Sequence, residues 1–351
     1  MTQARALLLG LGQIGFGYDA ALPFLLDQPR TSVQTLTHAR ALACHPGFVL
    51  AAGIDPSPEA RHRFTRLYGA PAYVDLASWR AASKDAPPDL VVIAVAPQLQ
   101  PSLVQELLQL TEPQLLLLEK PVISDLKQGR ALQAVCERHP QMHVAVNYIR
   151  RWLPSVQAWR RRLQVGELGQ LLHGQLTYGK GLLSNGSHFV NLAEAWLGPL
   201  TLGRVIDRGM PCQGFDCEGS LELLAADHGL APLHVRSVGL AGLRAGELDL
   251  WFEGGRLSWL NHGQAIAFWP RREPALGDSH APLSADPELH LTGLDHYQLE
   301  MVDSLHRHLQ ASDACPLLCT FSDGLHTLES LDPALSNACR NHISKKVLNY
   351  E

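Results

Sequence analysis

The sequence lacks the features of a membrane, secreted or nucleic-acid-binding protein. No apolar run reaches the roughly 18–20 residues that a membrane-spanning helix needs, and Met1 to Arg5 show no signal-peptide layout before the first apolar run. Basic residues are not in excess, because 29 Lys and Arg stand against 34 Asp and Glu, so the chain has no basic surface for a phosphate backbone. We therefore expect a cytoplasmic protein with no nucleic acid and no membrane among its partners.

Patterns for disulfides and metal sites are also lacking. The seven cysteines are odd in number, scattered and without a paired C-x-x-C set, which favours reduced thiols over disulfides or zinc. None of the 17 histidines stands in an H-E-x-x-H or similar ligand spacing. The chain shows no internal repeat and no low-complexity tract. We expect no bound metal.

What the chain does have is enough apolar sequence for two folded domains. Hydrophobic residues make up 46% of the 351 residues and charged residues 18%, a composition typical of globular proteins. A prior of about 150 residues per domain indicates two domains. We place the boundary where the pattern changes, giving residues 1–148 and 149–351.

The first domain alternates strand and helix patterns. Its apolar runs are continuous, as in strands that are covered on both faces of a parallel sheet. The runs are Ala6 to Leu9, Phe48 to Ile54, Leu90 to Val95, Leu115 to Leu118 and His143 to Val146, with helical stretches such as Thr37 to Cys44, Pro58 to Tyr68 and Ser102 to Leu110 between them. This alternation predicts a doubly wound parallel sheet of the Rossmann type, and the fold class α/β.

The second domain has a different pattern. A helix around Ser155 to Leu163 precedes several β-like stretches without helices between them, which predicts an α+β domain on a mostly antiparallel sheet. The stretches are Leu171 to Tyr178, Leu202 to Arg208, Ser220 to Ala226, His234 to Leu240, Glu247 to Phe252 and Arg256 to Leu260. Arg271 to Thr292 is rich in turn-forming residues and predicts a surface excursion. Helices are expected over His296 to Gln310 and Ser322 to Ser344.

The motif Gly10-x-Gly12-x-x-Gly15 follows the first strand and opens a helix, which is the context of a dinucleotide-binding turn. Gly10 would allow the tight turn, Gly12 would let a pyrophosphate approach the backbone, and Gly15 would let helix and strand pack closely. Asp55 ends the second strand, farther along than the usual ~20 residues, because residues 16–34 intervene. Its carboxylate would bind the ribose hydroxyls and repel a 2′-phosphate, so NAD is favoured over NADP.

Glu119-Lys120-Pro121 lies at the carboxyl end of a buried strand, where open α/β sheets place their ligands. The alternative for Lys120 is a solvent-facing helix start paired with Glu119. Two longer motifs follow later in the chain. They run from Asn147 to Pro154 and from Asn185 to Leu192.

With these four motifs in this order, nearly the whole chain resembles the glucose–fructose oxidoreductase/inositol dehydrogenase family, often called Gfo/Idh/MocA. The resemblance implies that Lys120 contacts both the substrate hydroxyl and the nicotinamide ribose, that the proline after it often takes a cis bond, and that His188 is the general acid or base. Imidazole titrates near neutral pH, and an ammonium stabilises a developing alkoxide, so these two side chains suffice for the oxidation of a secondary alcohol. The expected cofactor contacts are Gly10, Gly12, Gln13, Ile14, Gly15, Asp55, Ala96, Pro97, Glu119, Lys120 and Asn147.

The expected substrate contacts include one departure from the family pattern. Many family members carry an aspartate four residues before the histidine, where this chain has Ser184, followed by Asn185. We expect both to contact substrate and His188 to lack a nearby carboxylate. Tyr148, Arg150 and Arg151 stand at the domain junction; the arginines would hold a substrate phosphate or carboxylate, or else bridge the domains.

The sequence therefore predicts an NAD(H)-dependent dehydrogenase or reductase that acts on a hydroxyl or keto group of a sugar, sugar nucleotide or cyclitol. An NAD-assisted glycoside hydrolase of the same family and a non-catalytic ligand sensor are the alternatives. We also expect a homodimer or homotetramer, since the family commonly packs its open sheet face against another subunit. Alternating apolar residues would supply that face, namely Leu221, Leu223, Val235, Leu248 and Leu250.

Overall fold

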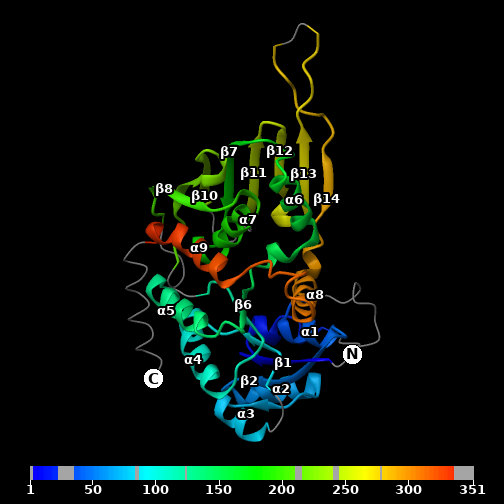
Figure 1. Cartoon of the computed structure of the whole chain (residues 1–351), viewed down its shortest axis with the longest axis vertical. Coiled ribbons are helices and arrows are strands. Elements are labelled where there is room, and N and C mark those ends of the chain that lie inside the picture. The colour runs from blue at the N-terminus through cyan, green and yellow to red at the C-terminus, as the bar shows by residue number, and fades with distance from the viewer. Residues whose placement is uncertain are drawn as a thin grey trace. The chain divides into compact units, whose positions relative to one another are not determined.

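The computed structural model describes residues 3–22, 35–83, 87–122, 125–209, 216–239, 245–276 and 279–335. The chain forms two compact units (Figure 1). Unit 1 consists of Met1–Trp152 and Asp295–Leu325, and unit 2 of Leu153–Leu294 and His326–Glu351. The first boundary lies four residues from the predicted one, but the sequence analysis had assigned 295–325 to the second domain.

Unit 1 is built on a six-stranded parallel sheet of order β3-β2-β1-β4-β5-β6, which confirms the predicted Rossmann-type fold. Its central strands β1, β4 and β5 are almost completely buried, as their continuous apolar runs indicated. The strands are β1 (Ala4–Leu9), β2 (Phe48–Ile54), β3 (Ala72–Tyr73), β4 (Leu90–Ile93), β5 (Leu115–Leu118) and β6 (His143–Val146).

Helices flank this sheet. They are α1 (His38–Cys44), α2 (Pro58–Tyr68), α3 (Leu76–Ala82), α4 (Gln100–Leu110), α5 (Leu126–Glu137) and α8 (Tyr297–Gln310), with the short helices η1 (Gln13–Gly17), η3 (Pro97–Leu99), η4 (Ile149–Trp152) and η8 (Leu294–His296). Several begin at a residue whose side chain accepts a backbone N–H bond, as Ser57 does for α2 and Asp125 for α5.

Two separate helices stand where a single helix was expected after the glycine motif. A five-residue π-helical turn, η1, follows the glycines, and α1 begins only at His38. The two ends of the intervening segment are joined by buried Asp19, whose carboxylate accepts N–H bonds from Leu36 (2.8 Å) and Thr37 (3.1 Å). The buried Arg40 guanidinium lies 3.4 Å from the same carboxylate. Asp19 thus joins the chain after η1 to the chain before α1.

Helix α8 belongs to unit 1 because its side chains pack on α1 and β6. The Tyr297 hydroxyl donates to the Leu36 carbonyl (3.3 Å), and the rings of His306 and His45 lie 4.8 Å apart. The imidazoles of His308 and His143 are hydrogen-bonded at 2.7 Å. A helix late in the sequence thus completes the first unit, which a single division of the sequence could not represent.

Unit 2 is built on an eight-stranded sheet of order β14-β13-β12-β11-β7-β10-β9-β8, which Figure 1 shows from right to left. All neighbouring pairs are antiparallel except β10 with β7, so the predicted, mostly antiparallel sheet is confirmed. The strands are β7 (Leu171–Tyr178), β8 (Leu200–Asp207), β9 (Ser220–Ala225), β10 (Ala231–Ser237), β11 (Gly246–Phe252), β12 (Gly255–Leu260), β13 (Ala265–Pro270) and β14 (Glu288–Leu291).

Two of these strands correct the sequence analysis. β13 was not predicted, and β14 lies in the stretch expected to be a surface excursion. The chain between them forms a long hairpin arm (Figure 1), with Arg271 and Leu283 paired across its base. All four β14 residues are exposed, so this edge strand carries no pattern of alternating burial by which a sequence could reveal it.

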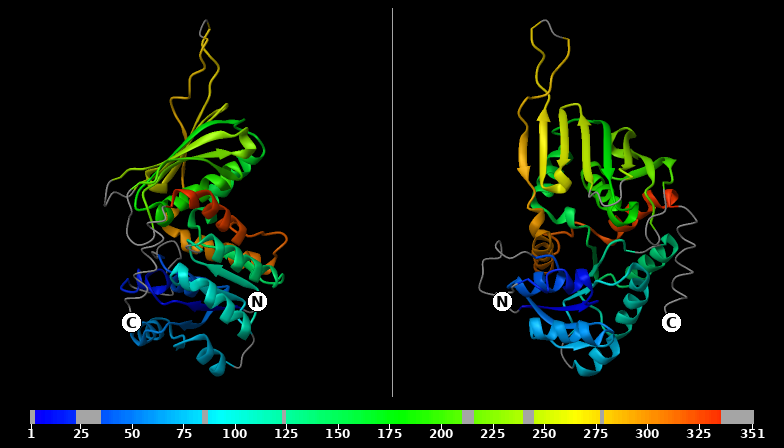
Figure 2. Two further views of the ribbon diagram at one scale, coloured as in Figure 1. Left: turned by 90° about the vertical axis from the view of Figure 1, so that its left-hand side faces the viewer. Right: turned by 180° about the vertical axis from the view of Figure 1, so that it is seen from behind.

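Among the described residues, helices cover only one face of this sheet (Figure 2). They are α6 (Pro154–Gln164) and α7 (Ser187–Leu197), together with part of α9 (Phe321–Leu331), and the unit also contains the short helices η5 (Leu182–Gly186), η6 (Ala226–His228), η7 (Asn261–Gly263) and η9 (Asp332–Ala334). The predicted helix over Ser322 to Ser344 corresponds to α9 as far as Leu331, and its residues beyond 335 lie outside the described chain.

The side chains proposed for a subunit contact point the other way. Leu221, Leu223, Val235, Leu248 and Leu250 are at most 1% exposed within the single chain, because they are the core residues beneath the helices. That expectation was wrong about the face. The period of two tells which residues share a face but not which of the two faces the helices cover.

The uncovered face is polar and aromatic; it is called the open face below. The Arg256 guanidinium lies between Trp251 and Trp269, 5.4 and 5.0 Å from their ring centres, and its Nε donates to Asp249 at 2.7 Å. Trp251 is 39% exposed. The open face thus carries large side chains that no part of the described chain covers completely.

Two further properties concern the described residues. None of their helices combines the length and apolarity that a bilayer span requires. The cysteines among them, Cys44, Cys136, Cys217, Cys315 and Cys319, form no disulfide with one another.

Candidate functional site

The glycine turn has the geometry that each glycine was expected to provide. Gly10 has φ +92°, and a Cβ there would lie 2.5 Å from the Ala94 carbonyl oxygen. A Cβ on Gly15 would lie 2.0 Å from the Gly10 carbonyl oxygen, so the turn can close only with glycine at this position. A Cβ on Gly12 would meet nothing within 4 Å. The backbone at Gly12 therefore borders open space, as a pyrophosphate cradle requires.

Asp55 stands directly after β2 and next to this turn. Its Oδ2 accepts the Leu11 N–H and its Oδ1 accepts the Ser57 N–H, each at 2.8 Å. Arg61 folds back on the same strand end, where its NH1 donates to the carbonyls of Asp55 (2.7 Å) and Pro56 (2.8 Å). The carboxylate is thus fixed beside the glycine turn, and the nearest arginine is held by backbone oxygens.

Lys120 follows β5 and begins a cis peptide bond to Pro121, the geometry that the family resemblance implied. The preceding residue, Glu119, is 7% exposed and accepts hydrogen bonds from Asn147 Nδ2 (2.7 Å) and from its neighbour's backbone N–H (3.2 Å). Its Oε1 also lies 2.7 Å from Nε2 of the fully buried His38. Burial would raise the pKa of Glu119, but the bonds from His38 and Asn147 outweigh it and hold that pKa below its usual value.

This buried group of His38, Glu119 and Asn147 changes the interpretation of two residues. Asn147 was expected to contact the cofactor, but its amide NH2 is used by Glu119, which leaves its Oδ1 without a hydrogen-bond partner among the described residues. His38 was not predicted as a site residue at all. Gln100 Nε2 completes the support of this loop by donating to the Glu119 carbonyl at 2.9 Å.

The other expected cofactor contacts lie at the same edge of the sheet. Gln13 and Ile14 belong to η1, directly after the glycine turn, and Ala96 and Pro97 begin η3, after β4. Unit 1 therefore brings the expected cofactor residues to the carboxyl ends of its parallel strands, which is where open α/β sheets bind ligands.

The residues expected at the domain junction are more deeply buried than a free binding surface would be. Tyr148, Arg150 and Arg151 are 2%, 4% and 3% exposed. The Arg151 NH1 forms an ion pair with Asp323 Oδ1 at 2.9 Å. Burial lowers the pKa of Arg150 to about 9, which leaves it cationic at neutral pH. The ion pair favours a structural role for Arg151, and Arg150 stays a candidate for binding a substrate anion.

In unit 2, Ser184, Asn185 and His188 lie on one helical stretch, in which the π-helical η5 passes directly into α7. Ser184 is exposed and His188 is 7% exposed. The Asn185 Nδ2 donates to the carbonyls of Gly179 (2.8 Å) and Ala245 (3.0 Å). The side-chain amide of Asn185 thus stabilises the local backbone, whereas the Ser184 side chain is exposed.

A carboxylate that the sequence analysis did not predict as a site residue stands at the start of this stretch. Asp216 is 2% exposed, and its Oδ2 accepts the Ser184 N–H at 2.8 Å. No local pattern in the sequence indicates this contact, because 32 positions separate the two residues. The neutral Ser184–Asn185 pair therefore does not mean that the His188 helix lacks a carboxylate at its start.

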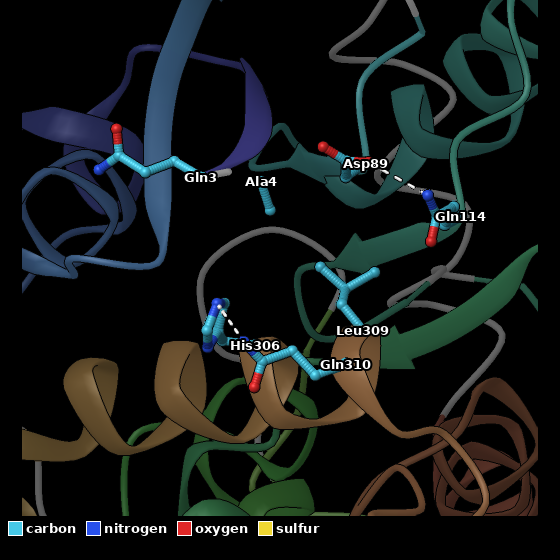
Figure 3. A pocket seen from close by; sticks show the side chains of 7 residues that line it. All are labelled: Gln3, Ala4, Asp89, Gln114, His306, Leu309 and Gln310. Atoms are coloured by element: carbon cyan, nitrogen blue, oxygen red, sulfur yellow. Dashed lines mark hydrogen bonds between the residues drawn. The ribbon is translucent and has the colours of Figure 1, made fainter. Parts of the chain in front are cut away.

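A separate cavity of about 190 Å³ lies at the opposite edge of the unit 1 sheet (Figure 3). Gln3, Ala4, Asp89 and Gln114 border it at or just before the first residues of β1, β4 and β5, and α8 contributes the remaining lining. Gln114 Nε2 donates to Asp89 at 3.1 Å across its wall. Because it lies at the amino ends of the strands, it is not the expected dinucleotide site.

Comparisons with known proteins agree with the fold. The WlbA dehydrogenase from Bordetella pertussis, solved with NADH and UDP-GlcNAcA, superimposes with a TM-score of 0.73 at 17% identity, covering 97% of this chain and 96% of that one. A myo-inositol dehydrogenase from Corynebacterium glutamicum gives 0.67 at 18% identity, covering 98% of each chain. A variant of KijD10, a 3-ketoreductase from Actinomadura kijaniata solved with TDP-benzene and NADP, gives 0.68 at 16% identity, covering 97% of this chain and 98% of that one.

A comparison with curated protein sequences returned no match. The family model described as "Oxidoreductase family, NAD-binding Rossmann fold" matches residues 5–148. This range contains the glycine turn, Asp55 and the Glu119-Lys120-Pro121 loop. The resemblance drawn from the motifs is confirmed over residues 5–148, which match the Gfo/Idh/MocA oxidoreductase family model with its NAD-binding Rossmann fold.

Proposed function

We propose that the protein is an NAD(H)-dependent oxidoreductase that transfers hydride between nicotinamide and a secondary hydroxyl or keto group of a sugar, sugar nucleotide or cyclitol. The observation that carries this proposal is that the Lys120 loop, supported by hydrogen bonds to Glu119, and the glycine turn, which borders open space at Gly12, stand at the same edge of one sheet. The match of residues 5–148 to an NAD-binding oxidoreductase family supports it, as do the similar structures of a sugar-nucleotide dehydrogenase and an inositol dehydrogenase.

The residues present fit a dinucleotide. The backbone at Gly12 would take the pyrophosphate, and the Asp55 carboxylate would accept hydrogen bonds from the adenosine ribose and repel a 2′-phosphate. The Arg61 NH1, bound to two carbonyls, is not placed to attract such a phosphate with that nitrogen. This supports NAD over NADP. When bound, the nicotinamide would accept or donate the hydride.

The chain's own part in the chemistry is to hold and move a proton. We assign Lys120 to the substrate hydroxyl, where its ammonium would stabilise a developing alkoxide. We assign His188 to the transfer of the hydroxyl proton, since an imidazole titrates near neutral pH. Arg150, still cationic in its buried position, is our candidate for a substrate phosphate or carboxylate.

Two interpretations compete with this proposal. A glycoside hydrolase of the NAD-assisted kind would use the same residues and release no net NADH. A ligand sensor would bind cofactor and ligand without turnover. The buried hydrogen-bonded support of the Lys120 loop favours an enzyme, because positioned groups of this kind are held by such outer contacts in catalytic sites.

The experiment has two steps. Titration of NADH and NADPH by fluorescence comes first, and tighter binding of NADPH would contradict the role of Asp55. Free sugars, sugar nucleotides and inositols are then screened for a change in NADH absorbance, with products analysed for bond cleavage. Cofactor binding together with ligand-induced thermal stabilisation, but without absorbance change or product, would favour the sensor.

We further propose that the open face is a contact between copies of this chain. The exposed Trp251 and the Trp-flanked Arg256 are residue types that interfaces favour. Light scattering should give a mass of two or four times 38.5 kDa. A Trp251→Asp variant should shift it toward 38.5 kDa, and a wild type of 38.5 kDa at micromolar concentration would refute the proposal.

A further inference from the structure

The segment that precedes β9 contains a buried carboxylate that accepts hydrogen bonds from several backbone amides of unit 2. Asp216 Oδ1 accepts the N–H groups of Leu183 and Cys217, and its Oδ2 accepts the N–H of Ser184, each at 2.8 Å. The next residue, Cys217, accepts the Leu182 N–H with its carbonyl oxygen, also at 2.8 Å. Residues 216 and 217 thus bind three successive amides at the start of η5.

The N–H groups of Leu182, Leu183 and Ser184 need an acceptor from outside their own helix. The first N–H groups of a helical segment have no partner within it, and η5 continues without a break into α7, whose second residue is His188. The helical stretch is therefore continuous from Leu182 to Leu197, and Asp216 closes its open end. A negative charge at that end also stabilises the stretch through the peptide dipoles.

The approach is close enough to restrict the neighbouring residue. A Cβ on Gly181 would lie 2.1 Å from Asp216 Oδ2, and Gly181 has φ +91°. Glycine at 181 therefore allows the carboxylate to reach the amides, for both steric and conformational reasons.

The segment that carries Asp216 is itself anchored on two sides. The Tyr178 hydroxyl, from β7, donates to the Gly219 carbonyl at 2.5 Å. The Cys217 thiol lies 3.7 Å from the Ala334 carbonyl oxygen of η9. Asp216 can thus transmit a fixed position from the sheet to the helix that bears His188.

We propose that Asp216 is a positioning residue for the reaction: through the amides of Leu183 and Ser184 it fixes the helical stretch that carries His188. The proposal rests on the proposed function for the part that concerns turnover, and on contacts alone for the part that concerns the helix. A carboxylate is needed because it only accepts hydrogen bonds, whereas an asparagine would turn a donor toward one of these N–H groups.

The test compares Asp216→Asn with Asp75→Asn, which removes a carboxylate that accepts a backbone N–H at the start of α3, away from the open face. Hydrogen exchange is measured by mass spectrometry on the NADH-bound full chain. Peptides covering 182–190 should exchange at least tenfold faster in Asp216→Asn and at the wild-type rate in Asp75→Asn. Unchanged exchange at 182–190 in a folded Asp216→Asn protein overturns the proposal.

Kinetics then distinguish positioning from general stabilisation. With a substrate found by the screen, Asp216→Asn should lower kcat about tenfold or more and leave the KM for NADH within twofold, and Asp216→Glu should recover part of the loss. Loss of kcat and of cofactor binding together would contradict a positioning role. Absence of any wild-type turnover would count against the proposed function alone, since the exchange result stands independently.

If Asp216→Asn does not fold, the wild type still provides a test. The backbone N–H groups of Leu183, Ser184 and Cys217 should be among the slowest to exchange in residues 181–190 and 216–220. Rapid exchange at these three amides would overturn the proposal.

Discussion

The two units position their parts of the proposed site in different ways. In unit 1 the glycine turn, Asp55 and Lys120 each stand at the carboxyl end of a strand, so each is placed by the residues immediately before it. In unit 2 the helical stretch of His188 depends on Asp216, which is 32 positions from the residue it binds. Short motifs describe the first arrangement and miss the second.

The two units also differ in the hydrogen-bond partners of their buried carboxylates, Glu119 in unit 1 and Asp216 in unit 2. Glu119 is bound by the side chains of His38 and Asn147 and by one backbone N–H, whereas Asp216 accepts three backbone N–H bonds. Side-chain partners can be removed one at a time by mutation. Backbone partners can be tested only by changing the carboxylate itself or the glycine next to it.

The largest effect is expected from mutations that remove either of the two proposed chemical groups, one in each unit. Lys120→Ala and His188→Ala should each reduce turnover roughly 10²–10⁴-fold, the range for a positioned acid or base, with NADH affinity nearly unchanged. Steady-state kinetics and fluorescence titration measure the two quantities. Nearly full turnover in His188→Ala would show that His188 does not carry the proton and that unit 2 does not supply the acid or base.

The next largest effect is expected in the glycine turn, where two variants distinguish a loss of stability from a loss of cofactor binding. Gly15→Ala should lower the free energy of unfolding by about 1–3 kcal/mol, as overpacking does, because the new Cβ would lie 2.0 Å from the Gly10 carbonyl oxygen. Gly12→Ala is the matched control: its φ of −76° suits alanine and its Cβ meets nothing. It should unfold like the wild type yet bind NADH more weakly. Equal stability of the two variants would refute this distinction.

A smaller effect is expected from the buried partner of Glu119. His38→Gln should cost about 1–3 kcal/mol of stability at neutral pH, because a buried carboxylate loses a hydrogen bond. The partly exposed pair of His139 and Glu112, at 3.2 Å, gives the control His139→Gln, with an expected cost of about 0–1 kcal/mol.

The pH dependence of this variant follows from the lowered pKa of Glu119 in the folded state. Stability from such a group is present above the unfolded-state pKa and is lost as the pH falls through the folded-state pKa. Without His38 the folded-state pKa rises, because burial then acts with less opposition. Acid unfolding followed by circular dichroism should begin at higher pH in His38→Gln than in the wild type. Identical acid transitions would show that His38 does not set the charge of Glu119.

The smallest effect is expected at Ser184. Its side chain is exposed, so Ser184→Ala should change stability by no more than about 0.5 kcal/mol and turnover by about twofold. Kinetics and thermal unfolding measure both. A loss comparable to that of Asp216→Asn would mean that the Ser184 hydroxyl, and not its backbone amide, is what the site uses.

The sequence predicts what is determined locally or by periodic burial. Gly10, Gly12 and Gly15 have steric requirements that any strand–turn–helix imposes, and the buried strands of unit 1 appear as apolar runs. β14 was missed because an exposed edge strand has no burial pattern. The helix α8 was assigned to the wrong unit because its partners, such as His45 and His143, are far away in sequence.

The candidate site also contains residues that local sequence predicts and residues that it does not. Asp55 and Lys120 could be found from strand ends, but His38 reaches Glu119 across 81 positions and Asp216 reaches Ser184 across 32. No spacing in the sequence reports such pairs. The face of the unit 2 sheet was assigned incorrectly for a related reason, since alternation alone does not say on which side the helices lie.

The closure of residues 19 to 37 by Asp19 has a practical consequence for protein engineering. Because the Asp19 carboxylate accepts the N–H groups of Leu36 and Thr37, the chain before residue 23 and the chain after residue 34 are joined directly. Lengthening a loop whose ends are already joined costs little, about 0.6 kcal/mol for each doubling. We therefore expect a short peptide inserted between Leu22 and Thr35 to leave the cofactor residues of the glycine turn in their positions.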